Sequence, residues 1–460
     1  MMTLAVVTLA AGKGSRMKSD LPKVLHTLAG KPMLGHVLDS ASQLEQATQH
    51  VVIGHGAEKV QQTFEGADIQ WAMQTEQNGT GHAVAQAMPN VADDATVLVL
   101  YGDVPLITTE TLTALLAETH HQTDNPGGLA LLTVELDDPT GYGRIVRDDA
   151  GNIQAIVEHK DASEEQRAIC EVNTGILAAS AAHLNRWLPA LSSNNAQGEY
   201  YLTDIVAMAV EEGTAVRAIF ASSEEEVQGV NDRVQLAQLE RVYQSKVAED
   251  LLRQGVAMAD PARVDVRGTL TVGRDVFIDV GCVFEGDVTL EDGVRIGPNC
   301  VIKSARLGAG TRVDAFSLVE QATTANDCVV GPYARLRPGA ELAEQAKVGN
   351  FCEIKKSFVG KGSKVNHLTY VGDAEIGEDV NVGAGTITCN YDGVNKYKTI
   401  IGDGAFIGSN SALVAPANIG AGVTVAAGSV ITSPVDDHHL AVARGRQRNI
   451  SGWKRPEKKS

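Results

Sequence analysis

The chain has 460 residues, of which 43% are hydrophobic, 21% are charged and 4% are aromatic, and 46 are glycine. This length predicts two or three domains, and this composition excludes a chain that is disordered throughout. The 39 Lys and Arg residues against 57 Asp and Glu residues give a formal net charge of −18, which disfavours a general nucleic-acid binder or a protein of anionic membranes.

The cysteines and the first residues indicate a cellular compartment. The six cysteines form no C-x-x-C pair, which argues against a disulfide framework or a zinc site and favours a reducing environment. The apolar run 4–11 is too short for a signal peptide or a membrane span. We therefore expect a cytoplasmic protein that binds neither nucleic acid nor membrane.

In the amino half, short apolar runs alternate with segments of helical spacing. This alternation predicts an α/β domain around a buried, largely parallel sheet, with ligands bound at the carboxyl ends of its strands. The expected strands are 4–9, 50–53, 96–101 and 128–134, and the expected helices include 32–43 and 80–87.

A different pattern begins near residue 255. A long helical pattern over 232–254 ends at Gly255, and apolar residues then recur every six positions, as in the series that starts at Val266 and continues through Ile302. A period of six predicts the hexapeptide coils of a parallel β-helix. Cys282, Cys300 and Cys352 occupy its small-residue positions. We expect domains at 1–230 and 255–440, a helical linker at 231–254 and a basic tail at 441–460.

The first strand leads into a loop with chemistry of its own. Gly12 and Gly14 allow backbone N–H groups to approach a phosphate, and Arg16 and Lys23 would neutralise its charge. The loop is neither a Walker motif nor a full dinucleotide fingerprint. Asp103 follows a buried strand, where a carboxylate is well placed to hold Mg²⁺.

These motifs resemble a known family over nearly the whole chain. The runs 9–17, 79–82 and 101–103 are similar to nucleoside-diphosphate-sugar pyrophosphorylases, and the hexapeptides, His367 and the pair Asn390-Tyr391 resemble left-handed β-helix acyltransferases. Together they look like the bacterial bifunctional N-acetylglucosamine-1-phosphate uridyltransferases/glucosamine-1-phosphate N-acetyltransferases. The resemblance implies a Rossmann-like α/β nucleotidyltransferase domain followed by a left-handed parallel β-helix.

The resemblance also implies the reactions. Glucosamine 1-phosphate would be acetylated by acetyl-CoA, and N-acetylglucosamine 1-phosphate would then react with UTP and Mg²⁺, to supply cell-wall synthesis. Arg16 and Lys23 would be catalytic in the second reaction, and Asp103 and Asn231 would hold the metal. The implied contacts to UTP and its sugar phosphate are Leu9, Ala10, Ala11, Gly12, Lys23, Gln74, Gly79, Thr80, Tyr101, Gly102, Asp103, Gly143, Glu158, Asn173 and Asn231.

In the second half, an amine nucleophile needs a base, and His367 is the only histidine between residues 184 and 437. The resemblance assigns that role to it and implies a homotrimer. It further implies acceptor contacts from Arg337, Lys355, Tyr370 and Asn381 and acetyl-CoA contacts from Ala384, Asn390, Tyr391, Ser409, Ala427 and Arg444.

Two other functions stay open at this point. One is a monofunctional sugar-nucleotide pyrophosphorylase whose β-helix serves only as an oligomerisation scaffold. The other is a binding or structural solenoid with a degenerate amino domain. His367, Lys355 and the insertion 390–399 argue against the first alternative, and Arg16, Lys23 and Asp103 argue against the second.

Overall fold

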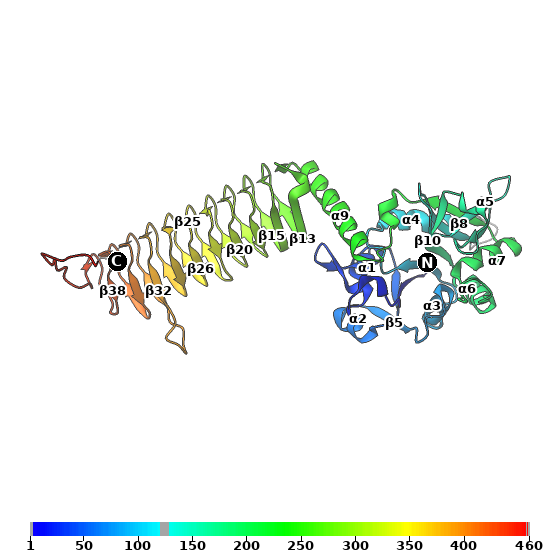
Figure 1. The fold of residues 1–460 in the computed structure, drawn as a ribbon, viewed down its shortest axis with the longest axis horizontal. Coiled ribbons are helices and arrows are strands. Elements are labelled where there is room, and N and C mark those ends of the chain that lie inside the picture. The colour runs from blue at the N-terminus through cyan, green and yellow to red at the C-terminus, as the bar shows by residue number, and fades with distance from the viewer. Residues whose placement is uncertain (1–2, 120–127, 457, 459–460) are drawn as a thin grey trace. The chain divides into compact units, whose positions relative to one another are not determined.

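The protein is described by a computed structural model that covers residues 3–119, 128–456 and 458. The chain divides into two compact units, Met1–Tyr243 and Gln244–Ser460. Helix α9 (Arg233–Arg253) runs from the first unit into the second and ends before Gly255, whose φ of +99° is typical of a residue that terminates a helix. Both units are drawn in Figure 1.

The first unit is built on one sheet. Its main path in the described residues has the order β11-β7-β10-β6-β1-β4-β5, with β8 and β9 attached beside β10. The strands are β1 (Leu4–Ala10), β4 (Ala47–Ile53), β5 (Ile69–Met73), β6 (Thr96–Tyr101), β7 (Leu129–Glu135), β8 (Arg144–Arg147), β9 (Ile153–Val157), β10 (Glu171–Ser180) and β11 (Val216–Phe220).

Helices cover both faces of this sheet. Alternate residues of β1 belong to two separate hydrophobic clusters, because successive side chains of a strand point to opposite faces. Residues of α3, α6 and α7 join one cluster and residues of α1 and α4 join the other. The helices are α1 (Met33–Ser42), α2 (Ala57–Thr63), α3 (Thr80–Ala87), α4 (Thr109–Glu118), α5 (Glu164–Arg167), α6 (Ala181–Trp187), α7 (Ile205–Glu211) and α8 (Glu224–Val227).

The sheet is parallel on one side and mixed on the other. Strand β1 pairs in parallel with β4 and β6, but β10 runs antiparallel to both β6 and β7. A strand that is buried on both faces shows a continuous apolar run whichever way it points, so the sequence pattern carries no direction. The parallel part holds the carboxyl ends of β1 and β6, which position the first site.

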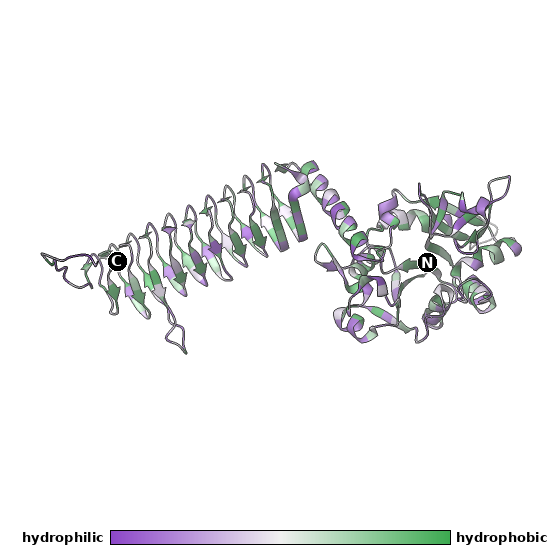
Figure 2. Ribbon diagram, in the orientation of Figure 1, coloured by the Kyte–Doolittle hydropathy of each residue, from purple (hydrophilic) through white to green (hydrophobic). Residues whose placement is uncertain are grey.

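The second unit is a parallel β-helix of hexapeptide repeats. Its strands stack as successive coils, and Figure 1 shows this stack, with apolar residues coloured green along it in Figure 2. One face carries β12 (Ala257–Met258), β14 (Phe277–Ile278), β16 (Arg295–Ile296), β19 (Arg312–Val313), β22 (Val329–Val330), β25 (Lys347–Asn350), β28 (Lys364–His367), β31 (Asn381–Val382), β34 (Phe406–Ile407), β37 (Thr424–Val425) and β39 (Leu440–Ala441). A larger sheet extends from β13 (Val264–Val272) to β38 (Val430–Ile431).

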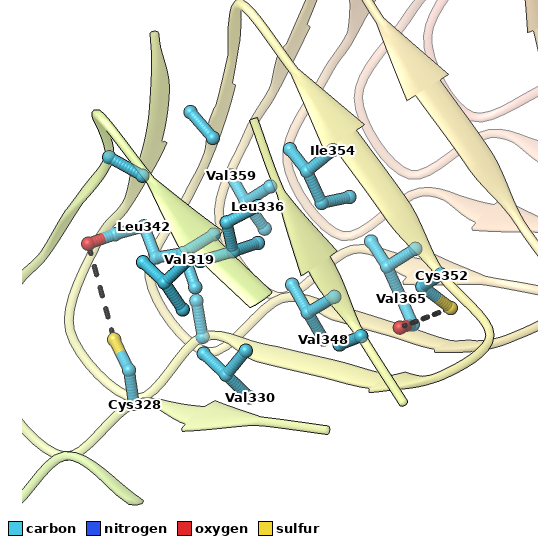
Figure 3. Packing of buried hydrophobic residues seen from close by; sticks show 14 of the residues in the cluster. Val319, Cys328, Val330, Leu336, Leu342, Val348, Cys352, Ile354, Val359 and Val365 are labelled. Atoms are coloured by element: carbon cyan, nitrogen blue, oxygen red, sulfur yellow. Dashed lines mark hydrogen bonds between the residues drawn. The ribbon is translucent and has the colours of Figure 1, made fainter. Parts of the chain in front are cut away.

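The period-six residues form the core of this unit, as predicted. Figure 3 shows Val330, Val348 and Val365 pointing into the interior, together with apolar residues from the other faces. The cysteines at small-residue positions are buried with them, and Cys352 Sγ lies 3.3 Å from the carbonyl oxygen of Val365. Burial raises the pKa of the Cys300 thiol to about 12, which makes it unreactive.

The predicted insertion leaves the coil between β32 (Ile387–Cys389) and β33 (Thr399–Ile401). Val365 pairs with Val382 and Val382 pairs with Ile407, so the register advances by 17 residues and then by 25. The additional residues project from the stack in Figure 1. This is the segment in which the sequence period breaks.

Candidate active sites

The loop after β1 lies at the carboxyl edge of the parallel strands. Gly14 has a φ of +59°, and a Cβ built on it would lie 2.6 Å from the Cβ of Lys23. Glycine at this position therefore lets the 3-10 helix η2 (Lys23–Leu25) pack directly against the loop. Arg16 follows on η1 (Ser15–Met17) with an exposed side chain, where it is accessible to an anionic ligand.

Lys23 joins two residues that are distant in sequence. Its Nζ contacts the carboxylate of Asp103 and lies 3.2 Å from Oδ1 of Asn231, which is 208 residues further along the chain. A hydrogen bond from the Val230 N–H to the Asp103 carbonyl oxygen, at 2.9 Å, holds that segment in place. The carboxylate and amide oxygens thus converge on one cation, as the ligands of a Mg²⁺ ion would. Asp103 and Asn231 fit the predicted metal.

The polar run after β5 is held rigidly. Gln74 is only 3% exposed, and its Nε2 donates to the Gly79 carbonyl oxygen at 3.2 Å. Gly79 has a φ of +110°, and a Cβ there would lie 2.5 Å from the carbonyl oxygen of Tyr200. Thr80 accepts a hydrogen bond from the Leu202 N–H at 3.1 Å. These contacts place the segment around Tyr200 beside this polar run.

A cavity of about 310 Å³ joins these elements. Ligand sites in proteins begin at about this size. Gly102 is not among the lining residues; its N–H donates to the Leu9 carbonyl oxygen at 2.9 Å, and a Cβ built on it would lie 3.1 Å from Cδ1 of Leu34. The predicted contacts that line the cavity are Leu9, Ala10, Ala11, Gly12, Lys23, Gln74, Gly79, Thr80, Tyr101 and Asp103.

Three further predicted contacts lie directly before β8, directly after β9 and on β10. A Cβ on Gly143 would lie 3.4 Å from Oε1 of Glu158, and the Asn173 N–H donates to the Gly143 carbonyl oxygen at 2.9 Å. Burial raises the pKa of Glu158, and a hydrogen bond from Thr203 partly opposes that rise. Among the described residues, the buried Oδ1 of Asn173 has no hydrogen-bond partner. A polar ligand could donate a hydrogen bond to this atom, since a buried acceptor without a partner lowers the stability of the fold.

In the β-helix, one column of residues runs across five successive coils. Each member stands two positions after an inward-pointing residue of β25, β28, β31, β34 or β37, and those inward residues are paired in register. At about 4.8 Å per coil, His367 and Ala427 lie ~14 Å apart along this column. Its members are Asn350, His367, Ala384, Ser409 and Ala427. Arg444 reaches the last of them, since its Nη1 donates to the Ala427 carbonyl oxygen at 2.7 Å.

The column supplies His367 with a hydrogen-bond partner. Nδ1 of His367 lies 2.7 Å from Oδ1 of Asn350 on the preceding coil. With the amide oxygen as acceptor, Nδ1 carries the proton and Nε2 keeps its lone pair. His367 is exposed, so this lone pair is accessible to a substrate. The pair therefore has the arrangement of a general base and the group that orients it.

Around the next corner of the coil, cationic side chains are grouped. The pKa of Lys355 is lowered chiefly by contact with Lys396, whose ammonium repels a second positive charge, and to a lesser degree by Arg337. Lys355 precedes the corner after β26 (Glu353–Lys355), and Tyr370 begins the neighbouring β29 (Tyr370–Gly372). Like charges in one place favour an anionic ligand, because an anion relieves their repulsion.

The insertion is anchored beside this cationic group. Asn390 donates through Nδ2 to the Asp373 carboxylate at 2.6 Å, and Tyr391 pairs with Lys396 across the base of the loop. The Tyr391 side chain stays 59% exposed. Asn381 lies on β31, paired with Lys364 of β28, and thus one coil beyond the strand of His367.

Comparisons with known proteins match one family model in each unit. Residues 6–148 match the family model of the MobA-like NTP transferase domain, and residues 270–304 and 398–433 match that of the bacterial transferase hexapeptide. A protein of Marinobacter nauticus named "Bifunctional protein GlmU" is 59% identical over 458 residues, which cover 100% of both chains. The chain belongs to the GlmU family. Relatives of the same name from Cellvibrio japonicus and Pseudomonas entomophila are each 59% identical over 457 residues, or 99% of this chain and 100% and 99% of theirs.

Membership of the GlmU family confirms the predicted resemblance and fold class. Sequence reasoning nevertheless missed several residues of the sites. Gln77 and Glu199 line the cavity of the first unit. In the second unit, Lys396 lies beside Lys355, and Asn350 contacts His367. Asn350 and His367 are 17 residues apart, which is the length of one coil. The repeat period could therefore have predicted that these two residues lie side by side. Glu199 lies in no motif, and only the fold brings it to the cavity.

Among the described residues, no helix combines the length and the apolar character needed to cross a membrane. All six cysteines are present as free thiols.

Proposed function

We propose that each unit of the chain catalyses one of two reactions. As a member of the GlmU family, the chain is a bifunctional enzyme of UDP-N-acetylglucosamine synthesis, and this nucleotide sugar is a precursor for peptidoglycan and lipopolysaccharide. Uridylyl transfer is assigned to the Met1–Tyr243 unit and acetyl transfer to the Gln244–Ser460 unit. The observation that carries the assignment is the convergence of Asp103 and Asn231 on Lys23 in one unit and the pair His367–Asn350 in the other.

In uridylyl transfer, a phosphate oxygen of N-acetylglucosamine 1-phosphate attacks the α-phosphorus of UTP. A P–O bond forms, the bond from the α-phosphorus to the bridging oxygen breaks, and pyrophosphate leaves. The nucleophile is already an anion, so the site needs alignment and charge neutralisation rather than a strong base. Asp103 and Asn231 would hold Mg²⁺, which would supply neutralisation of the phosphate charge. Lys23 and Arg16 supply the remaining positive charge.

In acetyl transfer, Nε2 of His367 removes one proton from the ammonium group of glucosamine 1-phosphate and passes it to solvent. The neutral amine nitrogen then bonds to the acetyl carbon of acetyl-CoA, and the thioester C–S bond breaks. The second proton that the nitrogen loses passes through the imidazole to the departing CoA sulfur. Arg337, Lys355 and Lys396 provide positive charge for the sugar phosphate, with Tyr370, Asn381, Asn390 and Tyr391 around the acceptor and the acetyl group. Ala384, Ser409, Ala427 and Arg444 mark the path of acetyl-CoA along the column.

The two activities should be separable in the full-length enzyme. With EDTA in place of Mg²⁺, pyrophosphate release from UTP and N-acetylglucosamine 1-phosphate should stop, while release of the CoA thiol from acetyl-CoA and glucosamine 1-phosphate should continue. Paired assays on one preparation measure this. Loss of both activities in EDTA, with restoration of both by Mg²⁺, would contradict two chemically independent sites. A monofunctional pyrophosphorylase would release no CoA thiol under either condition.

We also propose that the protein is a cytoplasmic homotrimer. Phe316, Tyr333 and Phe351 form an exposed stack with ring centroids 5.0 and 5.3 Å apart. Leu368, which is 63% exposed, follows on the next coil and adjoins His367. An exposed apolar patch of this kind is typical of an interaction surface. The free thiols suit a reducing compartment.

Light scattering with size-exclusion chromatography tests the trimer. The mass should be three times the 48.6 kDa of one chain. Tyr333→Ser should shift the population toward smaller species, because it replaces the central ring of the stack with a polar group. Phe220→Ser, at an exposed position of the first unit, is the control and should leave the mass unchanged. A monomeric wild-type protein at micromolar concentration would refute the proposal.

A further inference from the structure

Arg144 is a buried arginine beside the sugar contacts of the first unit. Its side chain is 1% exposed, and it lies at the start of β8, directly after Gly143. Arg147 on the same strand offers a contrast, because it is partly exposed and forms a bidentate ion pair with Glu171 at 2.7 and 2.8 Å. A buried guanidinium is costly unless its N–H groups are satisfied. Among the described residues, Nε of Arg144 has no hydrogen-bond partner, so the contacts of its two Nη groups indicate its role.

Two of those contacts are with residues adjacent in sequence to predicted sugar contacts, and the third is with the end of α5. Nη1 of Arg144 donates to the carbonyl oxygen of Tyr142, the residue before Gly143. Nη2 lies 3.3 Å from Nδ1 of His159, the residue after Glu158. The same Nη2 donates to the carbonyl oxygen of Arg167 at 3.3 Å. One guanidinium thus connects the turn before β8, the end of β9 and the end of α5.

The third sugar contact is linked through the backbone. Arg144 is paired with Val172 of β10, and the next residue, Asn173, donates its N–H to the Gly143 carbonyl oxygen at 2.9 Å. Asn173 also presents the buried Oδ1 that has no partner among the described residues. Arg144 thus contacts the residues next to Gly143 and Glu158, and its strand partner Val172 is next to Asn173.

We propose that Arg144 is a positioning residue that sets the sugar selectivity of uridylyl transfer. It holds Tyr142 and His159 in place, and so keeps the backbone of Gly143 and the carboxylate of Glu158 at the distance that an acetamido sugar requires. Misplacement of a contact by about 1 Å can reduce turnover about 10²-fold. Loss of the Arg144 hydrogen bonds should therefore weaken use of the sugar phosphate strongly and use of UTP only slightly. The inference rests on the proposed uridylyl transfer.

The test compares full-length Arg144→Met, Arg144→Lys and the matched control Arg147→Met. In Arg144→Met, we expect the KM for N-acetylglucosamine 1-phosphate to rise about 10- to 100-fold, while the KM for UTP stays within about twofold. The preference in kcat/KM for this substrate over glucosamine 1-phosphate should fall. The KM of Arg144→Lys for N-acetylglucosamine 1-phosphate should lie between those of the wild type and Arg144→Met, because a lysine keeps the charge but cannot reach all three acceptors. Arg147→Met should behave like the wild type, since an exposed ion pair contributes little.

UTP binding measured by calorimetry without turnover reports whether the first unit is folded. If Arg144→Met does not bind UTP, Arg144→Lys is judged by the same criteria. Equal increases in both KM values, or an unchanged sugar preference in a folded variant, would overturn the positioning role. A wild-type enzyme that does not turn over N-acetylglucosamine 1-phosphate would instead refute the proposed function.

Discussion

His367→Ala should lower kcat of acetyl transfer by roughly 10²–10⁴-fold, the usual contribution of a general base. The amine cannot attack the thioester while it is protonated, and His367 is the histidine whose Nε2 lone pair is exposed on the column. The KM for acetyl-CoA should change little, because the imidazole acts on the amine. Steady-state assays of CoA thiol release over a range of acetyl-CoA concentrations measure both parameters.

His439→Ala is the matched control for that experiment. His439 is also exposed in the second unit, but its Nδ1 lies 2.9 and 3.1 Å from the carbonyl oxygens of Asp437 and Asp436. This variant should keep wild-type acetyl transfer, and uridylyl transfer should survive in both variants. Asn350→Ala should cause a smaller loss than His367→Ala, because it removes the orienting group and leaves the base. Near-normal acetyl transfer by His367→Ala at neutral pH would place the base elsewhere.

Asp103→Ala should reduce uridylyl transfer by roughly 10³-fold or more, since it would remove the proposed charged metal ligand and the partner of Lys23. Acetyl transfer should be unaffected. Binding of Mn²⁺ as a spectroscopic substitute for Mg²⁺ should weaken in parallel, and this measurement does not depend on turnover. Asp103→Asn, which keeps an oxygen but loses the charge, should show an intermediate affinity for the metal.

Asp39→Ala is the control for the metal site. Asp39 is exposed on α1 and pairs with Lys31 at the surface, so its loss should alter neither activity. If Asp103→Ala binds Mn²⁺ as tightly as the wild type, the metal is held by other residues. If a folded Asp103→Ala protein loses both activities, the two sites are not independent.

Much of the architecture is determined by local patterns in the sequence. The period of six between Val266 and Ile431 predicts the β-helix, because each coil contacts only its neighbours and packs against them in the same way. The same period explains the buried cysteines and identifies 390–399 as an insertion. In the first unit, the apolar run of β1 followed by Gly12 and Gly14 identifies an anion-binding loop. These features depend on residues close together in the chain.

The tertiary structure alone decides which distant groups meet. Asn231 reaches Lys23 in a segment that the hydrogen bond between Val230 and Asp103 holds in place. Glu199 lines the cavity of the first unit beside Tyr200, whose backbone contacts Asn78 and Gly81. The antiparallel direction of β10 is likewise invisible in its apolar sequence. Arg144 looks like Arg147 in the sequence, yet one is buried among backbone carbonyls and the other pairs with Glu171 at the surface. Such contacts are set by packing across many residues, and no pattern within a short segment encodes them.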